Sequence, residues 1–269
     1  MKHGLQPLCP SKYSLRTGLA LSILGGGLVW GSVAPVQAFP TSVPILGPTG
    51  LGFIPTTDTV PAQQGEVSAS YEKVNPNVGK VTFAPVLTAN YGLRRAELGV
   101  AYLHERTEVP GFTIGNHYTT LHAKYLLLES AKSGAALAVG VHHLDFGGLP
   151  GKVNSLYLVG SYPVWRREDR NESVRAHLGV IHHRISGGGA ITNATRPMGG
   201  IDWAVNQEVT LAADYTPRRG AAVPLWSIVA RYQKASTPSW GVELGYGRQN
   251  GSDDKFFAGV NYRFGKAAE

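Results

Sequence analysis

The chain of 269 residues has little of three things: cysteine, charge and long apolar runs. Its single cysteine, Cys9, lies in an N-terminal segment that we expect to be removed. The mature chain is therefore expected to form no disulfide and no cysteine-based metal site. Only 16% of the residues are charged, yet no stretch beyond residue 38 holds a run of apolar residues long enough for a transmembrane helix.

The excess of positive charge is also small. The formal net charge is +7, but Lys2, Lys12 and Arg16 lie in the first 38 residues, which contain no Asp or Glu. Subtracting these three from the 25 basic residues leaves 22 against 18 acidic residues, a net charge of +4. This balance, without a long basic run, gives no reason to expect a nucleic-acid partner.

The N-terminal segment has the parts of a secretory signal peptide. Basic residues come first, residues 19–34 (LALSILGGGLVWGSVA) form an apolar run, and Val36-Gln37-Ala38 offers small residues at the cleavage positions. We expect cleavage after Ala38, so that residues 1–38 are the signal peptide. The alternative is an uncleaved anchor helix, which three consecutive glycines at 25–27 disfavour, since each costs about 1 kcal/mol relative to alanine.

Residues 39–65 are rich in Pro, Gly and Thr, a composition that forbids a regular helix or a central strand. We predict an ordered lead-in that lies across the mouth of a barrel or is inserted in it as a plug. The barrel itself is predicted over residues 66–264, followed by a short polar tail at 265–269.

From Glu66 onward the hydrophobic pattern has a period of two. Apolar residues at 98, 100 and 102, for example, alternate with Glu97, Gly99 and Ala101. Such segments recur between Gly-, Asn- and Pro-containing turns, which predicts an all-β, antiparallel, up-and-down barrel. Including weaker segments near 154–164, 197–204 and 225–234, about 12 strands are expected, and 10 would also fit. The strand near 67–73 should pair with the strand near 256–264, because lipid cannot satisfy a free strand edge.

Alternation alone does not distinguish a soluble barrel from a membrane barrel, but three features favour a transmembrane barrel in the bacterial outer membrane. The second row of each strand is small, as expected for a crowded lumen; its members include Gly99, Ala101, Ala138, Gly140, Gly179, Gly241, Gly245 and Gly259. Aromatic residues gather near the strand ends, where membrane interfaces place them: Tyr71, Tyr91, Tyr102, Tyr118, Tyr162, Trp165, Tyr215, Trp240 and Tyr246. The last strand, KFFAGVNYRF, resembles the C-terminal signal of outer-membrane barrels, although residues 265–269 follow its final aromatic residue. A soluble, lipocalin-like barrel is the rival interpretation.

Three segments resemble the YjbH-like barrels linked to exopolysaccharide export. They are GPTGLGFIPTTDTVPAQQGEVSASY (47–71), GGIDWAVNQEVTLAADYTP (199–217) and the ending FFAGVNYRF (256–264). The resemblance is a pattern of hairpins and carries no catalytic motif. It implies an outer-membrane location and a role near surface polysaccharide.

Polar residues on the inward row are the candidate site. They are Glu97, His122, Lys124, His142, Arg175, His177, Glu208, Asp214, Arg231, Glu243 and Arg263. Opposite charges in a narrow tube are expected to pair across it and plug it. The histidines are interpreted as hydrogen-bonding lumen groups, so we expect no metal and no cofactor.

A hydrolase is disfavoured by spacing. His182 and Ser186 share a strand face but lie about 13 Å apart, at about 3.3 Å per residue. The leading hypothesis is therefore a non-enzymatic barrel with no catalytic residues, associated with polysaccharide export or envelope structure. Its rivals are a narrow pore for small solutes and an outer-membrane lipid or glycan hydrolase. The expected partners are outer-membrane lipids, the barrel-assembly machinery and polysaccharide.

Overall fold

The computed structural model describes residues 49–75, 80–147, 151–187, 190–218, 224–234, 239–249 and 253–265. All of them belong to one compact unit, Pro35–Glu269. The expected signal peptide (1–38) with its cleavage after Ala38, the start of the lead-in (39–48) and most of the expected tail (266–269) lie outside the described residues.

The described residues form twelve strands and one short 3-10 helix, η1 (Glu168–Arg170), between β6 and β7. The strands are β1 (Gln64–Asn75), β2 (Lys80–Gly92), β3 (Ala96–Val109), β4 (Phe112–Glu129), β5 (Ala136–Asp145), β6 (Gly151–Arg167), β7 (Glu172–Gly187), β8 (Ala190–Ala204), β9 (Val209–Thr216), β10 (Leu225–Gln233), β11 (Trp240–Gln249) and β12 (Asp253–Gly265). Among the described residues, no helix is long and apolar enough to cross a membrane.

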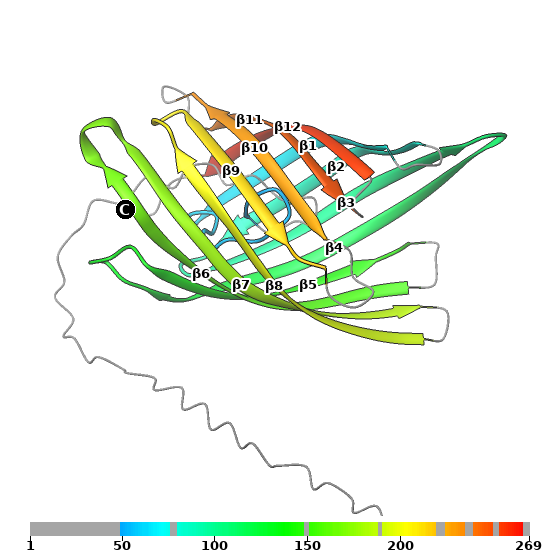
Figure 1. The fold of residues 1–269 in the computed structure, drawn as a ribbon, viewed down its shortest axis with the longest axis horizontal. Coiled ribbons are helices and arrows are strands. Elements are labelled where there is room, and N and C mark those ends of the chain that lie inside the picture. The colour runs from blue at the N-terminus through cyan, green and yellow to red at the C-terminus, as the bar shows by residue number, and fades with distance from the viewer. Residues whose placement is uncertain are drawn as a thin grey trace, which may run out of the picture. The chain divides into compact units, whose positions relative to one another are not determined.

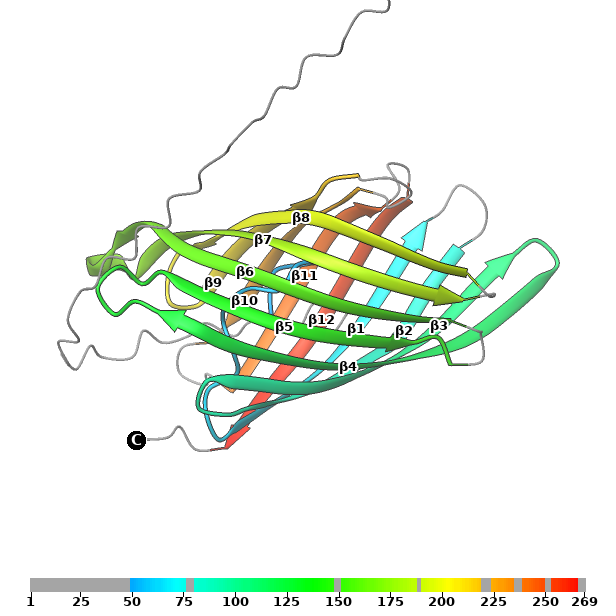
Figure 2. The same ribbon diagram turned by 90° about the horizontal axis from the view of Figure 1, so that it is seen from below.

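Each strand pairs with the next along the chain, and β12 pairs with β1, so the sheet is a closed barrel (Figures 1 and 2). The closing pair is antiparallel and runs from Gln64 opposite Gly265 to Asn75 opposite Asp254. The predicted 12-strand, up-and-down antiparallel barrel and the predicted meeting of its first and last strands are confirmed.

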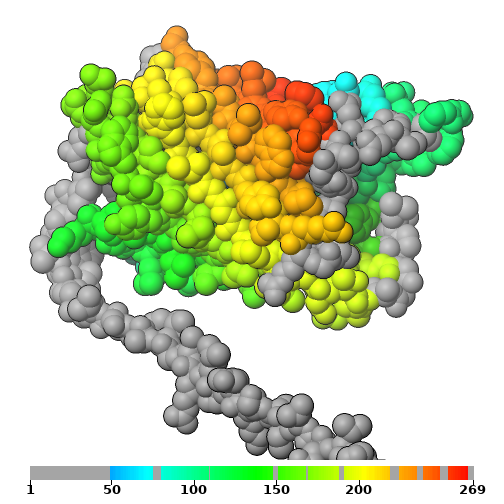
Figure 3. Space-filling model, in the orientation of Figure 1, coloured from blue at the N-terminus to red at the C-terminus, as the bar shows by residue number. Residues whose placement is uncertain are grey.

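The barrel exposes its apolar row and buries its polar row. Leu98, Leu121 and Leu178 are exposed on the outside, whereas Glu97 and His177 are completely buried on the inside. A soluble barrel would have the opposite arrangement, so the lipocalin-like alternative is not supported. The outer wall formed by β7 to β12 is a closely packed surface (Figure 3), and its apolar side chains suit hydrocarbon.

The small row faces the lumen, where it leaves space for large side chains on neighbouring strands. Gly140 stands directly opposite Tyr157, and Gly245 directly opposite Phe257. A Cβ atom at either glycine would collide with the facing ring. The rings therefore lie flat against the inner wall, a way of covering a glycine that stabilises sheets.

Two aromatic residues expected outside lie inside. Tyr118 was assigned to the outer aromatic belt, but it shares a face with Thr120 and packs with Phe83 against the buried cluster of Val86. An unbroken alternation along β2 would likewise place Phe83 outside, in one row with Leu87 and Tyr91. The ladder shifts between Phe83 and Val86, where Pro85 has no N–H to donate, and the shift turns Phe83 inward.

Candidate functional site

Residues 49–60, called the plug below, turn back on themselves inside the barrel (Figures 1 and 2). The Leu51 N–H donates to the Ile54 carbonyl at 2.9 Å, and the Thr56 N–H donates to the Thr49 carbonyl at 3.2 Å. These bonds make a tight loop whose tip is Gly52-Phe53. The plug is followed directly by β1, so it enters the lumen from the end of the barrel where β1 begins.

Glu97, on β3, holds both ends of the plug. One carboxylate oxygen accepts the Thr49 N–H at 3.0 Å, and the other accepts the Thr49 hydroxyl and the Val60 N–H, each at 2.9 Å. Lys124, on β4, lies 3.8 Å from the same carboxylate and donates to the Thr49 carbonyl at 3.0 Å. Thr49, Glu97, Lys124 and Val60 are all buried.

The rest of the loop is bound from the opposite side of the barrel. Asp214, on β9, accepts the Phe53 N–H at 2.6 Å, which fixes the tip. Arg231, on β10, donates to the Gly50 carbonyl at 2.9 Å. Since wall residues on both sides bind it, the plug crosses the lumen.

The strongest electrostatic contact of the plug is made by Asp58. The Arg175 guanidinium donates to both oxygens of Asp58, at 2.7 and 2.8 Å, and also binds both oxygens of Asp202. Burial raises the pKa of Asp58, but the charge and hydrogen bonds of Arg175, with smaller effects of His177 and Lys124, together hold that pKa below its ordinary value. The plug is thus tied to β7 by a charge-assisted, bidentate pair.

The same contacts continue into a ring that returns to the plug. His177 lies 2.9 Å from Asp202 through Nε2 and 2.7 Å from the Ser161 hydroxyl through Nδ1. The Thr57 hydroxyl donates to Ser161 at 2.8 Å. This ring is called the latch below; its members are Thr57, Asp58, Ser161, Arg175, His177 and Asp202.

Apolar contacts add to the polar ones at the middle of the lumen. Leu51 and Ile54 of the plug are buried in one cluster with inward-facing wall residues: Ala138, Tyr157, Val159, Met198, Ala212, Val229 and Phe257. The plug therefore fills the lumen with both kinds of contact.

The structure brings most of the sequence-predicted site residues into this lumen. Seven are buried there: Glu97, His122, Lys124, His142, His177, Asp214 and Arg231. The side chains of Arg175, Glu243 and Arg263 are largely buried and also pair inside the barrel. Glu208 was expected on the inward row of a strand, but it lies in the turn before β9. There the Asn206 side chain accepts its N–H at 2.8 Å.

Several lumen groups were missed by the sequence prediction. Asp58, Ser161 and Asp202 complete the latch, and Glu66, Glu72 and Lys255 line the seam between β1 and β12. Glu66 and Glu72 lie on the same alternating row as the serines at 68 and 70, so the period of two already places them inside. Asp58 has no such signal, because the plug has no period.

Two ion pairs fasten the closing seam from inside. Arg263 donates to Glu66, its direct cross-strand partner, at 2.8 Å, and Lys255 lies 2.6 Å from Glu72. Both carboxylates are completely buried. The seam thus has charged contacts in addition to its backbone ladder.

Ser161, His177 and Asp202 are connected by hydrogen bonds in the same way as a hydrolase triad, but their surroundings do not suit catalysis. All three are buried, and the Ser161 hydroxyl is bound to Thr57 of the plug. Ser161 is paired on both sides, with Ala136 and His177, within the sheet. Its backbone N–H therefore belongs to the sheet ladder and is not free to bind an oxyanion.

The other candidate dyad is not assembled either. His182 lies 2.8 Å from the Thr195 hydroxyl, and the Ser186 hydroxyl donates weakly to the Lys152 carbonyl at 3.5 Å. Among the described residues, no group of three or more His, Cys, Asp or Glu side chains is arranged to hold a metal ion.

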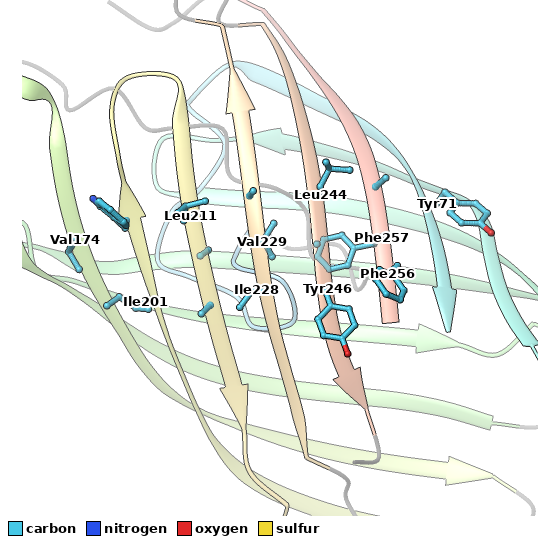
Figure 4. A pocket seen from close by; sticks show the side chains of 16 residues that line it. Tyr71, Val174, Ile201, Leu211, Ile228, Val229, Leu244, Tyr246, Phe256 and Phe257 are labelled. Carbon is cyan, nitrogen blue, oxygen red and sulfur yellow. The ribbon is translucent and has the colours of Figure 1, made fainter. Parts of the chain in front are cut away.

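Two hollows differ in place and character. Beside Arg175 and Asp202, the plug and the wall leave about 20 Å³, room for one water. A larger hollow of about 880 Å³ lies on the outer wall, where Leu211, Ile228, Leu244 and other apolar side chains line it (Figure 4). It belongs to the lipid-facing surface.

No protein-family model matches the chain, and no curated protein sequence matches it. Several solved structures, however, have a similar fold. An outer-membrane channel from Pseudomonas putida F1 superimposes with a TM-score of 0.57 at 12% identity, covering 77% of this chain and 98% of the other. The KdgM porin in complex with disordered oligogalacturonate gives a TM-score of 0.53 at 13% identity, covering 74% and 99%.

The chain shares its fold with outer-membrane channels. Together with the apolar outer wall and the polar lumen, this fold identifies a barrel of the bacterial outer membrane. The YjbH-like resemblance has no matching family model, and it stays a prediction. The first of its three motifs, residues 47–71, overlaps the plug and the first part of β1.

Proposed function

We propose that the protein is a non-enzymatic outer-membrane channel for small polar solutes, closed at rest by the plug. The observation that carries this proposal is the way the plug is bound. Polar side chains of β3, β4, β6, β7, β9 and β10 hold it through hydrogen bonds and ion pairs.

Polar contacts favour reversible binding, because water can replace each of them when the plug leaves. A hydrogen bond contributes a net of about 0.5–1.5 kcal/mol for this reason, against the larger cost of an unsatisfied group. Most of the plug-binding charges also keep an ion-pair partner on the wall: Glu97 pairs with Lys124, Arg175 with Asp202, and Arg231 with Glu243. An emptied lumen would keep these pairs and remain wettable.

The comparisons support a channel only because the fold is shared, and they do not identify the solute. A polysaccharide role rests only on the YjbH-like resemblance of residues 47–71, 199–217 and 256–264. We therefore propose passage of small polar solutes and treat polysaccharide as a solute to be tested in the same experiment.

Single-channel recording in planar bilayers tests the proposal. The mature wild-type protein should be closed most of the time and open rarely. Asp58→Asn removes the charge that Arg175 binds, and a hydrogen bond to a charged group contributes about 1.5–3 kcal/mol, so open time should rise about tenfold or more. Asp145→Asn is the matched control, since Asp145 pairs with Lys152 at 3.6 Å, away from the plug.

Two outcomes contradict the proposal. Silence in both the wild type and Asp58→Asn would mean a sealed barrel with an envelope role. Steady, equal openings in both would mean that the plug is not the gate.

A further inference from the structure

The hairpin of β3 and β4 carries an unexplained group of side chains on its outer face. This hairpin extends past the neighbouring strands (Figures 1 and 2). His104 and His117 stand directly opposite each other in its ladder, and Tyr102 precedes His104 on the same face. Both imidazoles are accessible from outside.

The outward positions farther along this hairpin carry no apolar side chain, which sets the group beyond the hydrocarbon layer. On β3 they are Arg106 and Glu108, and on β4 they are Thr113 and Gly115. Tyr102 thus stands where the apolar belt ends, a usual place for tyrosine at a membrane interface. Ions in the surrounding solution can reach the histidines.

Three polar atoms converge at this point. The Nδ1 atoms of His104 and His117 lie 3.1 Å apart, and the Tyr102 hydroxyl lies 2.6 Å from the Nδ1 of His117. The imidazole rings are tilted by 41° with centroids 4.7 Å apart, and the Tyr102 ring stacks on His117 at 5.8 Å.

Hydrogen bonding alone accounts poorly for this convergence. An imidazole Nδ1 has either one hydrogen or one lone pair in the ring plane. The Nδ1 of His117 therefore cannot form a good hydrogen bond with both Tyr102 and His104. A cation placed between the atoms would accept electron pairs from both imidazoles at once.

The spacing matches that role. Zinc–nitrogen bonds of about 2.0–2.1 Å in tetrahedral geometry place two ligand nitrogens about 3.3 Å apart. The observed 3.1 Å therefore needs only a small adjustment. We propose that His104 and His117, with Tyr102 as a third donor, form a surface site for a divalent transition-metal ion, Cu²⁺ or Zn²⁺.

The chemistry of the donors selects this class of ion. Imidazole suits Cu²⁺ and Zn²⁺, with Cu²⁺ bound more tightly, whereas Ca²⁺ and Mg²⁺ require several oxygens. The nearest outward carboxylate in the ladder, Asp145 of β5, stands opposite Thr119 and is paired with Lys152 at 3.6 Å. With two imidazoles and one phenol from the protein, water completes the coordination, and binding is reversible.

Calorimetric titration of the folded, tag-free mature protein in detergent with CuCl₂ and ZnCl₂ tests the site. One ion should bind per chain, Cu²⁺ more tightly. His104→Ala and His117→Ala should each weaken binding about tenfold or more, and Tyr102→Phe should weaken it less. His182→Ala is the matched control, because His182 is also outward and exposed, and its ring is hydrogen-bonded to the Thr195 hydroxyl at 2.8 Å.

Electron paramagnetic resonance of bound Cu²⁺ gives a second measurement. The wild type should show coupling to two imidazole nitrogens, and each single variant coupling to one. If an alanine variant fails to migrate as a folded barrel, His104→Gln or His117→Gln replaces it. Absence of saturable binding, undiminished binding in the His104→Ala/His117→Ala double variant, or an equal loss in His182→Ala would overturn the proposal.

Discussion

Glu97 shows how much one carboxylate can do in a narrow lumen. Ionised, it accepts three hydrogen bonds from the plug and faces Lys124. These donors come from Thr49 and Val60, so a single side chain closes the loop of the plug at its base. No other described contact ties both ends of the plug to one wall residue in this way.

Glu97→Gln should therefore release the plug. The amide keeps the size of the side chain but removes the charge, and breaking a buried ion pair costs about 3–5 kcal/mol. No cysteine lies beyond Cys9, so in a protein that starts at residue 39, Ile54→Cys in the plug can report exposure through its rate of maleimide labelling. We expect labelling to be slow in the Ile54→Cys protein and at least about tenfold faster when Glu97→Gln is added.

Glu129→Gln in the same reporter is the control, because Glu129 is exposed at the end of β4. Equal labelling rates in all three proteins would show that Glu97 does not hold the plug.

Ser161 tests whether the latch is structural or catalytic. Its hydroxyl contacts His177 and Thr57 and is buried. A fluorophosphonate probe should leave the protein unlabelled, both in the wild type and in Asp58→Asn, where the plug is loosened. Labelling that disappears in Ser161→Ala would instead establish a nucleophilic serine.

At the scale of strands, the seam between β1 and β12 depends on contacts that join the two ends of the chain. Glu66 and Arg263 are far apart in sequence and directly opposite in the ladder. Their pair is almost fully buried, whereas the Arg248–Asp254 pair in the hairpin of β11 and β12 is well exposed at a similar 2.8 Å. The two pairs are therefore both arginine–carboxylate ion pairs, one buried and one exposed.

Arg263→Gln should destabilise the barrel by about 3–5 kcal/mol, because it leaves the buried Glu66 charge without its partner. Arg248→Gln should cost much less, because its ion pair with Asp254 is exposed to solvent. Urea unfolding in detergent, followed by the heat-modifiable shift on gels, measures both. Similar losses in the two variants would mean that burial of the seam pair has no energetic effect.

The elements were predictable from sequence to the extent that they have a period. Alternation predicts the strands, the inward row and most lumen charges, since one side of each strand faces lipid. It fails for Phe83, where a bulge shifts the ladder, and for Glu208, where a turn precedes the strand. The plug contacts were not predictable, because a Pro- and Gly-rich segment has no period from which to read its path.

At the scale of the whole molecule, the barrel is defined by an apolar exterior around a charged interior. The exterior is apolar along most of each strand, and exposed polar side chains such as His117 and Asn193 stand nearer the ends. The most exposed of the large outward side chains described is Leu178, at 73%, in the middle of β7. Its surroundings in the cell are therefore expected to be acyl chains.

Leu178→Arg tests this placement, since the cost of a charge on a lipid-facing strand depends on its depth in the bilayer. It should reduce the folding free energy in liposomes by about 2–4 kcal/mol, the value for the bilayer midplane. Ile191→Arg, near the turn between β7 and β8, should cost about 0–1 kcal/mol, because Ile191 is also exposed but lies at a strand end. If the two substitutions cost the same in liposomes, or if neither changes the yield of folded barrel, the outer surface does not contact hydrocarbon at Leu178. A larger cost at Leu178 fixes the membrane along the middle of β7 and leaves the polar ends of the strands in water.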